Sequence, residues 1–533
     1  MPVGGALGHD ARMHSASGFS CLPRRRWRWF GAAVPLAATL LVLCGCVGLP
    51  PLQGRSVSTA MRDTGDTRLG AAVTRMLQPH PGLTGVLPLL DGHDAFAARA
   101  TLADAAQRSL DIQYYIWRDD LSGTLLLDAL RRAAGRGVRV RLLLDDNNTA
   151  GLDGKLRELE AHPLVEVRLF NPFAHRRWRA LDYLGDFARV NRRMHNKSFT
   201  ADNQVTVIGG RNVGDEYFGA SDGQLFVDLD VLAIGPVVAE VSEDFDRYWA
   251  SDSAYPLDLV LGPGTPAAVA ETRPDSSAQA VRAYRQAVAR SAFVRDLLAR
   301  RLPFEWARAR LVSDDPAKGL GRADHGETLW TRLQALLPRA QRELHLVSPY
   351  FVPTATGTEY LAALAGRGVE VSVLTNALES TDVPAVHAGY ARRRKPLLAA
   401  GVQLFELRRD LAEPKVRGRW LGGSSASSLH AKTFAVDRTH VFVGSFNFDP
   451  RSARLNTELG FVIESPGLAT RIAEQFAGDI PARAYRLQLE NGELNWVGQG
   501  EDGMEFWSSE PHVGFWLRLQ VWFFSLLPIE HLL

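Results

Sequence analysis

The most restrictive feature of this chain is an internal duplication: the pattern His-x-Lys-x-x-x-x-Asp occurs twice, once in each half of its 533 residues. Each copy leads into a turn that contains glycine and then into an asparagine at the same offset. Two complete copies are hard to explain by chance, and they predict one active site built from two halves. The residues concerned are His195, Lys197, Asp202, Asn212, His430, Lys432, Asp437 and Asn447.

The repeat extends to the predicted secondary structure around the motif. Segments 135–143 and 366–374 both begin Gly-Arg-Gly-Val and continue as strands. Strands predicted at 110–116 and 343–347, each followed by a helix, precede those segments. Alternating strands and helices predict α/β layers with a largely parallel sheet, and the short strands around each motif add antiparallel pairs. We expect two such domains, packed with pseudo-two-fold symmetry, with the motifs at their interface.

The residue types of the motif suit chemistry at a phosphodiester. Alternate residues of a strand share a face, so the His and the Lys of each copy point into a common pocket. One neutral His can attack phosphorus while the other protonates the leaving oxygen and then activates the acceptor hydroxyl. The lysines and asparagines would stabilise the non-bridging oxygens, so neither a metal nor another cofactor is expected. Only six of the 61 basic residues are lysines, and the motif holds two of them, which indicates a demand for a compact ammonium group.

These motifs resemble the HKD motifs of the phospholipase D superfamily, and the resemblance covers most of the chain beyond about residue 85. It implies two α/β/α sandwich domains with a shared active site, and catalytic roles for the six His, Lys and Asp residues of the motifs. It also implies that Asn212, Asn447 and Glu458 bind the substrate phosphate. The first-half counterpart of Glu458 is either Asp228 or Asp230. The aspartates Asp202 and Asp437 are expected to orient or support the histidines.

Within the superfamily, the chain resembles bacterial cardiolipin synthases of the C type. The segments that carry this resemblance are 171–173, 192–197 and 527–530. It implies a phosphatidyltransferase that makes cardiolipin from phosphatidylglycerol and a second phospholipid, phosphatidylglycerol or phosphatidylethanolamine, through a phosphohistidine. By the same analogy His195 is the nucleophile, although spacing alone does not say which histidine attacks. The alternatives are hydrolysis to phosphatidic acid, a nuclease with the same chemistry, and a membrane-anchored binding protein without activity.

Charge and spacing argue against other classes of partner. The formal net charge is +2, from 61 basic and 59 acidic residues, so nucleic-acid binding is not expected. A structural zinc site at the histidines is also not expected, because no Cys lies near either one. Basic runs at 175–193 and 392–395 are either solvated faces or surfaces that attract anionic lipid headgroups. Phospholipid substrates and a membrane surface are therefore the expected partners, and the need for an accessory protein is left open.

The N-terminus predicts export to the cell envelope. Arginines at 24–26 precede an apolar run at 29–47, the form of a signal peptide. The sequence Leu43-Cys44-Gly45-Cys46 resembles a bacterial lipobox, with Cys46 as the residue to be lipidated. An uncleaved transmembrane anchor is the alternative, since the run approaches spanning length. Either anchor predicts a membrane-attached enzyme in the bacterial envelope with its catalytic part facing the periplasm.

The remaining boundaries follow from composition. We expect a signal peptide over 1–46, a linker over 47–85, a first domain over 86–260, a connection over 261–328 and a second domain over 329–511. The C-terminal segment 512–533 is rich in aromatic residues and is too short for a confident membrane span. Its interpretation as a membrane-interfacial helix competes with that of a buried core helix.

Overall fold

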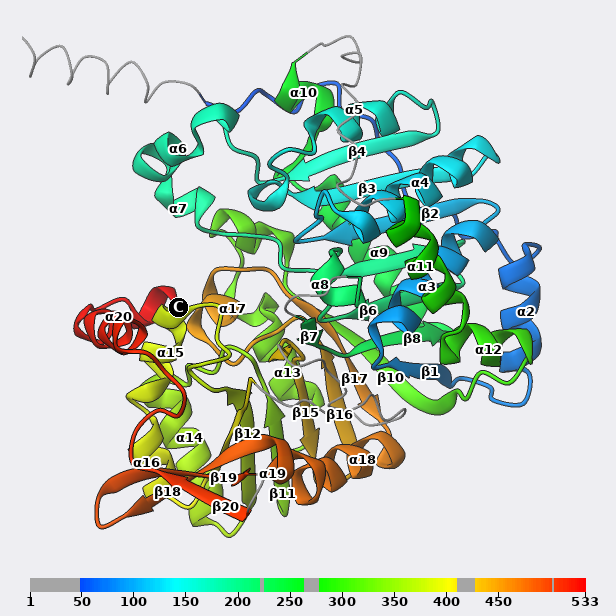
Figure 1. The fold of residues 1–533 in the computed structure, drawn as a ribbon. Helices are drawn as coiled ribbons and strands as arrows, with labels where there is room; N and C mark the ends of the chain where they lie inside the picture. Colours follow the sequence, from blue (N-terminus) through cyan, green and yellow to red (C-terminus); the bar gives the residue numbers. More distant parts are fainter. Residues whose placement is uncertain (1–47, 221–224, 263–277, 410–426, 501–502) are drawn as a thin grey trace, which may run out of the picture. The chain divides into compact units, whose positions relative to one another are not determined.

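Two copies of one strand arrangement form an 18-stranded sheet in the computed structural model of this protein (Figure 1). The structure describes residues 48–220, 225–262, 278–409, 427–500 and 503–533. In each half, three parallel strands are followed, on one side, by three antiparallel strands. The order across the whole sheet is β9-β4-β3-β2-β5-β6-β8-β1-β10-β17-β16-β15-β11-β12-β13-β18-β19-β20.

The strands of the first half are buried along almost their whole length, because helices cover both faces of the sheet. The first-half strands are β1 (Thr84–Leu89), β2 (Ser109–Tyr114), β3 (Arg139–Asp145), β4 (Val165–Phe170), β5 (Ser198–Ala201), β6 (Val205–Gly209), β8 (Asp230–Ile234) and β9 (Ala254–Pro256). The principal helices are α3 (Gly92–Ala105), α4 (Leu121–Gly135), α5 (Asp153–Glu160) and α9 (Pro236–Ala250). The first core packs α3 and α4 against β2 and β3.

The second half repeats this order. Its strands are β11 (Glu343–Val347), β12 (Glu370–Asn376), β13 (Gln403–Leu407), β15 (Thr433–Val436), β16 (His440–Gly444) and β17 (Leu459–Glu464), with β18 (Ala484–Glu490), β19 (Glu493–Gly500) and β20 (Gly503–Trp507) added at the edge. The principal helices are α13 (Leu329–Leu336), α14 (Thr354–Gly366), α16 (Arg394–Ala399), α18 (Pro466–Ala477) and α19 (Asp479–Arg483). The predicted two-domain α/β architecture is confirmed by this duplication.

A strand that the sequence analysis did not predict joins the halves. Strand β10 (Glu305–Ser313) lies inside the expected connection 261–328, and it pairs with β1 on one side and with β17 on the other. A second hydrophobic core contains residues from both halves, among them Ile208 and Val241 from the first and Val443 and Ile472 from the second. The two domains therefore share a sheet and a core. The helices just before β10 are α11 (Ala278–Ala289) and α12 (Ala292–Leu298).

The segment expected to be a linker is attached to the first half. It contains α2 (Arg68–Leu77), and Arg55 donates to the carbonyl oxygen of Ser251 at 2.6 Å. The guanidinium of Arg141 donates to the carbonyl oxygen of Ser58 at 2.9 Å. The predicted signal peptide and Cys46 lie outside the described residues. Within the described ranges, every helix is too short or too polar to cross a bilayer.

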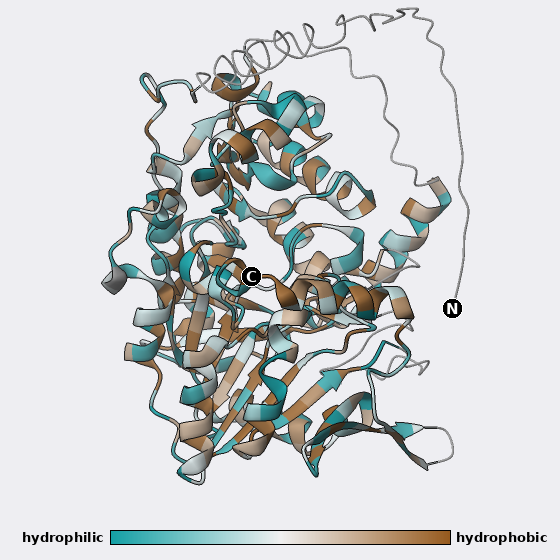
Figure 2. Cartoon of the chain, turned by 90° about the vertical axis from the view of Figure 1, so that its left-hand side faces the viewer, coloured by the Kyte–Doolittle hydropathy of each residue, from teal (hydrophilic) through white to brown (hydrophobic). Residues whose placement is uncertain are grey.

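The C-terminal helix α20 (Phe515–Leu526) has no buried residue, so the expectation of a buried core helix is wrong. It lies beside α15 (Pro384–Ala391), and Figure 2 shows it as a largely hydrophobic helix near the C-terminus. Beyond it, Glu530 forms an ion pair with Arg393 at 2.8 Å. The tail is thus fixed to the second half while α20 keeps large apolar side chains exposed.

Candidate active site

Each motif lies at the start of a hairpin next to the junction of the halves. His195 and Lys197 precede β5, which pairs with β6, and His430 and Lys432 precede β15, which pairs with β16. All four side chains are buried or nearly so. Lys432 lowers the pKa of Lys197, and both lysines lower the pKa of both histidines, which places the two motifs at one site.

Each histidine is held by a carboxylate from the other half. Nδ1 of His195 lies 2.8 Å from Oε2 of Glu458, and Nδ1 of His430 lies 2.6 Å from Oδ2 of Asp228. With Nδ1 occupied, Nε2 is the nitrogen that can react, as in other His–carboxylate pairs. Glu458 was expected to bind the substrate phosphate, but its carboxylate contacts His195 and would repel an anion. It is therefore a positioning residue for the histidine.

Backbone hydrogen bonds also join each histidine to the other half. The amide N–H of His195 donates to the carbonyl oxygen of Thr457 at 2.9 Å, directly before Glu458. The amide N–H of His430 donates to the carbonyl oxygen of Val227 at 2.8 Å, directly before Asp228. In both cases, therefore, a backbone hydrogen bond between the halves lies directly beside the contact between the histidine and its carboxylate. Neither half holds a complete His–carboxylate pair by itself.

The contacts of Asp228 and Asp230 decide which of them is the first-half counterpart of Glu458. The carboxylate of Asp230 accepts a hydrogen bond from Arg99 at 2.8 Å and from the amide N–H of Arg211 at 3.1 Å. It is part of a buried structural network and does not contact His430. The backbone beside Asp228 has no room for a side chain, since a Cβ on Gly210 would lie 2.1 Å from Oδ1 of Asp228. Asp228 is the counterpart of Glu458.

The two carboxylates have different surroundings. Glu458 also accepts hydrogen bonds from the hydroxyls of Ser445 and Ser452, whereas, within the part of the chain that the structure describes, Oδ1 of Asp228 accepts from the amide N–H of Leu229 alone. Burial raises the pKa of Glu458 to about 7, although the nearby Lys197 acts in the opposite direction. Burial also acts to raise the pKa of Asp228, but His430 and Lys432 outweigh it and lower that pKa to about 2. Asp228 is thus the more strongly ionised partner.

The histidines and lysines are biased toward their neutral forms in this pocket without substrate. Burial, followed by the charge of Lys432, lowers the pKa of His430 to about 4. Burial, followed by the charges of Lys197 and Lys432, lowers the pKa of His195 well below its usual range. Burial lowers the pKa of Lys432 to about 8. An anionic phosphodiester between these groups would favour their protonated forms.

The asparagines are not equivalent. The side-chain carbonyl of Asn212 accepts a hydrogen bond from the amide N–H of Ile116, and its NH₂ donates to the hydroxyl of Tyr217 at 3.0 Å. The side-chain oxygen of Asn447 is buried and has no hydrogen-bond partner among the described residues. Of the two, Asn447 has the unpaired polar atom, and this amide donates to a phosphate oxygen if it is turned so that its NH₂ takes the place of the oxygen. The placement of Asn212 fits a role in fixing Tyr217 beside His430.

Aromatic rings that the sequence analysis did not identify lie against the histidines. Tyr115 meets His195 edge-on, with ring centroids 4.9 Å apart, and Tyr217 meets His430 in the same way at 5.2 Å. The ammonium of Lys197 lies 5.4 Å from the centre of the Tyr115 ring. Tyr115 follows β2 and Tyr217 lies in α8 (Asp215–Phe218), and each is far in sequence from the histidine that it contacts. Only the tertiary structure brings these residues to the site.

The motif aspartates lie at the opposite end of the hairpins and do not contact the histidines. Asp202 accepts hydrogen bonds from the amide N–H groups of Gln107, Arg108 and Ser109, where β2 begins. Asp437 makes the same three contacts at 341–343, where β11 begins. At the rise of an extended chain, seven residues place Asp202 roughly 20 Å from His195. These aspartates therefore do not orient the histidines directly. Of the two expected roles, their contacts fit support, because they hold to the sheet the hairpins that follow the histidines.

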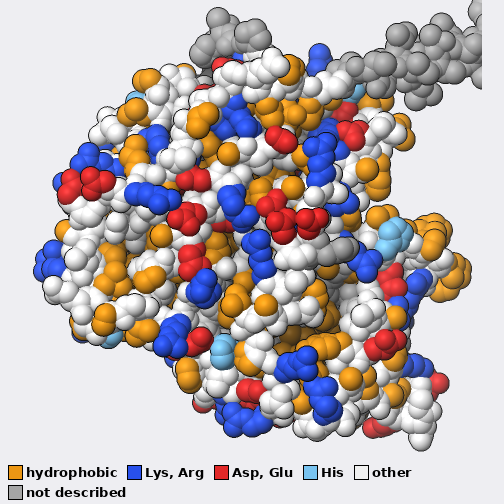
Figure 3. Space-filling view, turned by 180° about the vertical axis from the view of Figure 1, so that it is seen from behind, with side chains coloured by type: hydrophobic (Ala, Val, Ile, Leu, Met, Phe, Trp, Pro, Cys, Tyr) orange, Lys and Arg blue, Asp and Glu red, His pale blue; other side chains and the backbone are white. Residues whose placement is uncertain are grey.

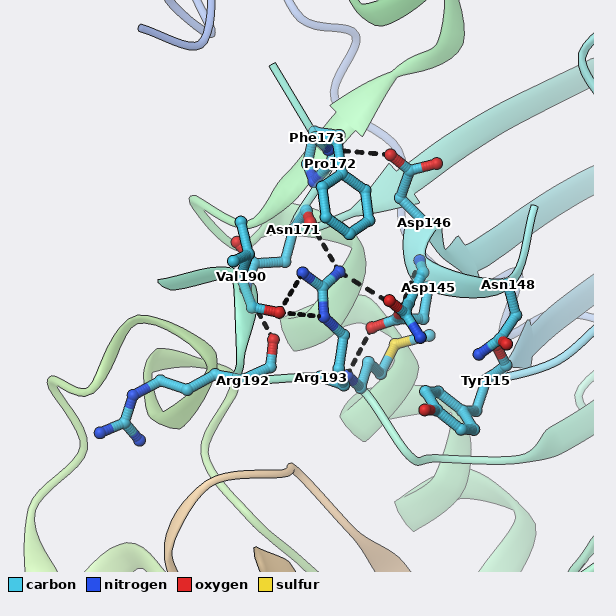
Figure 4. Close-up of polar contacts among 12 residues, drawn as sticks. Tyr115, Asp145, Asp146, Asn148, Asn171, Pro172, Phe173, Val190, Arg192 and Arg193 are labelled. Carbon is cyan, nitrogen blue, oxygen red and sulfur yellow. Dashed lines mark hydrogen bonds and ion pairs between the residues drawn. The ribbon is translucent and has the colours of Figure 1, made fainter. Parts of the chain in front are cut away.

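The segment that leads into His195 is fixed by a buried arginine (Figure 4). The guanidinium of Arg193 donates to the carbonyl oxygens of Val190 and Asn171 and lies 3.5 Å from Oδ1 of Asp145. Asp145 also accepts a hydrogen bond from the amide N–H of Met194 at 2.8 Å. These contacts place the residue before His195 at the end of β3.

Comparison with known proteins identifies relatives of the whole chain. The family described as "Cardiolipin synthase, PLD-like domain" matches residues 100–249 and 333–480, which are the two halves. Cardiolipin synthase C of Escherichia coli (strain K12) is 49% identical over 473 residues, which cover 87% of this chain and 100% of that protein. Cardiolipin synthase A of Pseudomonas entomophila (strain L48) is 28% identical and covers 73% of this chain and 67% of its own length.

A solved structure shares the fold. The crystal structure of phosphatidylserine synthase from Haemophilus influenzae Rd KW20 superposes with a TM-score of 0.55 at 14% sequence identity. The match covers 87% of this chain and 100% of that one. At this identity the likeness is one of fold alone, and it agrees with the duplicated α/β arrangement.

Proposed function

The chain belongs to the cardiolipin synthase family of phospholipase D-like proteins, and we propose that it makes cardiolipin by two-step phosphatidyl transfer at the shared pocket. The observation that carries this proposal is the pair of buried histidines, each held through Nδ1 by a carboxylate of the other half. Two such groups supply the nucleophile and the general acid–base that the reaction needs.

In the first step Nε2 of His195 attacks the phosphorus of a phospholipid. A phosphorus–nitrogen bond forms, the bond from phosphorus to the headgroup oxygen breaks, and protonated His430 gives its proton to that oxygen. The ionised Asp228 stabilises the imidazolium form of His430, which supports its role as the acid. The amide of Asn447 and the ammonium groups of Lys197 and Lys432 would bind the non-bridging oxygens.

In the second step a hydroxyl of phosphatidylglycerol enters the place of the departed headgroup. His430 removes its proton, the resulting oxygen attacks phosphorus, and the bond to His195 breaks with return of the electron pair to Nε2. The donor lipid is phosphatidylglycerol or phosphatidylethanolamine. Water in place of the hydroxyl would give phosphatidic acid, which is the second candidate reaction.

The location of the enzyme belongs to the same proposal. A signal peptide with lipidation at Cys46 would attach the chain to the bacterial envelope with its site toward the periplasm. The exposed α20 would lie in the membrane interface, since Trp516, Trp522 and Phe523 are more than half exposed. Removal of residues 512–533 is expected to weaken binding to liposomes without unfolding the rest.

The experiment that tests the activity is lipid mass spectrometry of a strain that lacks its own cardiolipin synthases. Expression of this chain should restore cardiolipin, and expression of the His195→Ala variant should not. Phosphatidic acid without cardiolipin would identify a hydrolase instead. No change in either lipid would contradict both reactions and would direct attention to other phosphodiesters, including nucleic acids.

A further inference from the structure

A second exposed apolar element lies next to the first histidine. The excursion 174–190 contains α6 (Arg179–Gly185) and α7 (Phe187–Val190) and ends five residues before His195. Trp178 is 72% exposed and Leu184 is 77% exposed, and Leu181, Tyr183 and Phe187 are exposed beside them. So many large apolar side chains on one short surface segment indicate a contact with a membrane or another molecule.

Polar contacts hold the excursion in this conformation. Arg176 forms ion pairs with Asp146 and Asp153, and the imidazole of His175 contacts the buried carboxylate of Asp182. At its base, the amide N–H of Phe173 donates to Asp146 at 2.8 Å (Figure 4). Polar groups therefore face the protein while the apolar side chains face outward, as expected of a built surface.

The excursion and the C-terminal tail are joined beside the active site by one arginine. The guanidinium of Arg451 donates to the carbonyl oxygen and the side-chain oxygen of Asn191, just after α7. The amide N–H of Arg451 donates to the carbonyl oxygen of Leu533, the last residue. The charge of Arg451 also contributes to the lowered pKa of His195, so this junction borders the pocket. Both apolar elements project on the left-hand side of Figure 1, the side that faces the viewer in Figure 2.

Unpaired arginines surround these apolar side chains. Among the described residues, five guanidinium groups near the two elements form no ion pair: those of Arg177, Arg192, Arg392, Arg454 and Arg518. Three carboxylates in or next to the two elements form ion pairs with arginines: Asp186 with Arg189, Glu510 with Arg394 and Glu530 with Arg393. Figure 3 shows hydrophobic and basic side chains together at the right-hand edge, where α20 lies. An apolar surface with a cationic border complements an anionic phospholipid bilayer.

We propose that the excursion 174–190 inserts into the anionic phospholipid bilayer together with α20, one element from each half, so that the pocket entrance faces the lipid interface. This proposal for the membrane surface rests on the proposed function only in one respect, the choice of phospholipid as the substrate in the kinetic experiment. A lipid could then reach His195 without leaving the bilayer.

Insertion is measured on the full chain reconstituted in phosphatidylglycerol vesicles that contain lipids brominated along the acyl chain. Trp178 fluorescence, obtained as the difference between the wild type and Trp178→Phe, should be quenched by these lipids. A matched control places tryptophan at Leu298 in the Trp178→Phe background, because Leu298 is 79% exposed on α12 and distant in sequence from both apolar elements. Its fluorescence should not be quenched. Equal quenching at both positions, or none at Trp178, would overturn the proposal.

A kinetic comparison tests the same surface. Leu184→Asp should lower the rate on vesicles by on the order of tenfold, because an exposed leucine that the bilayer would bury is replaced by a charge. It should leave unchanged the rate on short-chain phosphatidylglycerol dissolved as monomers. Leu298→Asp should affect neither rate. Equal losses for the two variants, or a loss on monomers, would contradict the proposal. Because quenching needs no turnover, a chain that inserts but makes no cardiolipin would refute the function and leave this surface intact.

Discussion

The carboxylate of Glu458, in the second half of the chain, lies 2.8 Å from Nδ1 of His195, in the first half. The reverse contact joins Asp228 of the first half to His430 of the second at 2.6 Å. Each motif histidine thus depends on the other domain for its orientation and proton affinity. This exchange explains why the halves share a sheet and a core, since a small rotation between them would separate both pairs.

The two carboxylates can be tested by removing their charge and keeping their shape. Glu458→Gln and Asp228→Asn should each lower kcat by on the order of a hundredfold or more, because the histidine loses the partner that fixes its tautomer. The KM for phospholipid should change little, since neither carboxylate contacts the phosphate. Steady-state kinetics check this. The variant Asp230→Asn is the control for Asp228, since Asp230 does not contact His430 and its replacement should lower kcat less. A folded Asp230→Asn variant with the larger loss would reverse the roles assigned to Asp228 and Asp230.

The pH dependence of kcat should be bell-shaped, because a bound phosphodiester favours the protonated form of His430. Glu458, whose burial raises its pKa to about 7, supports His195 only when ionised, so the rate should rise through about pH 7. Lys432, whose burial lowers its pKa to about 8, binds phosphate only when protonated, so the rate should fall above about pH 8. In Glu458→Gln the acidic limb near pH 7 should disappear. Persistence of that limb would assign it to another group.

The motif aspartates should affect stability more than chemistry. Asp202→Asn replaces a buried carboxylate that accepts three backbone N–H groups, so the free energy of unfolding should fall by about 2 kcal/mol. The rate per folded molecule should stay within a few-fold of the wild type. Asp437→Asn is the matched variant at the less buried copy and should cost less. Thermal unfolding and active-site titration check both, and a full loss of turnover in a stable Asp202→Asn protein would contradict the structural role.

Removal of divalent metals should leave turnover unchanged, because Lys197, Lys432 and Asn447 already provide cationic and amide donors for the phosphate. Activity on vesicles is measured after treatment with a chelator and again after metal is added back. The vesicles should be prepared without divalent ions, so that changes in lipid packing are not mistaken for catalysis. A loss that the added metal restores would require a metal in the mechanism.

The sequence predicted the repeating parts of this protein well and the contacts between them poorly. The strands around both motifs and the helices α4 and α14 lie where the sequence predicted them. The signals used, alternating apolar residues and glycines at the ends of helices, are local. Strand β10 was missed, since its two partners come from different domains and no local pattern requires them. The partners of the histidines could not be assigned for the same reason: Glu458 was taken for a phosphate ligand, and Asp228 could not be separated from Asp230. The fixed spacing of the aspartate in each motif suggested a role in catalysis, whereas its contacts hold the hairpin to the sheet.

The proposed two-step transfer requires a covalent bond between phosphorus and His195. The most direct measurement is mass spectrometry of peptides from enzyme mixed with phospholipid and stopped within the first turnover at alkaline pH, where a phosphorus–nitrogen bond survives. We expect a phosphatidyl adduct on the peptide that contains His195 and none on the peptide that contains His430. An adduct on His430, or cardiolipin formed with no adduct on either histidine, would contradict it.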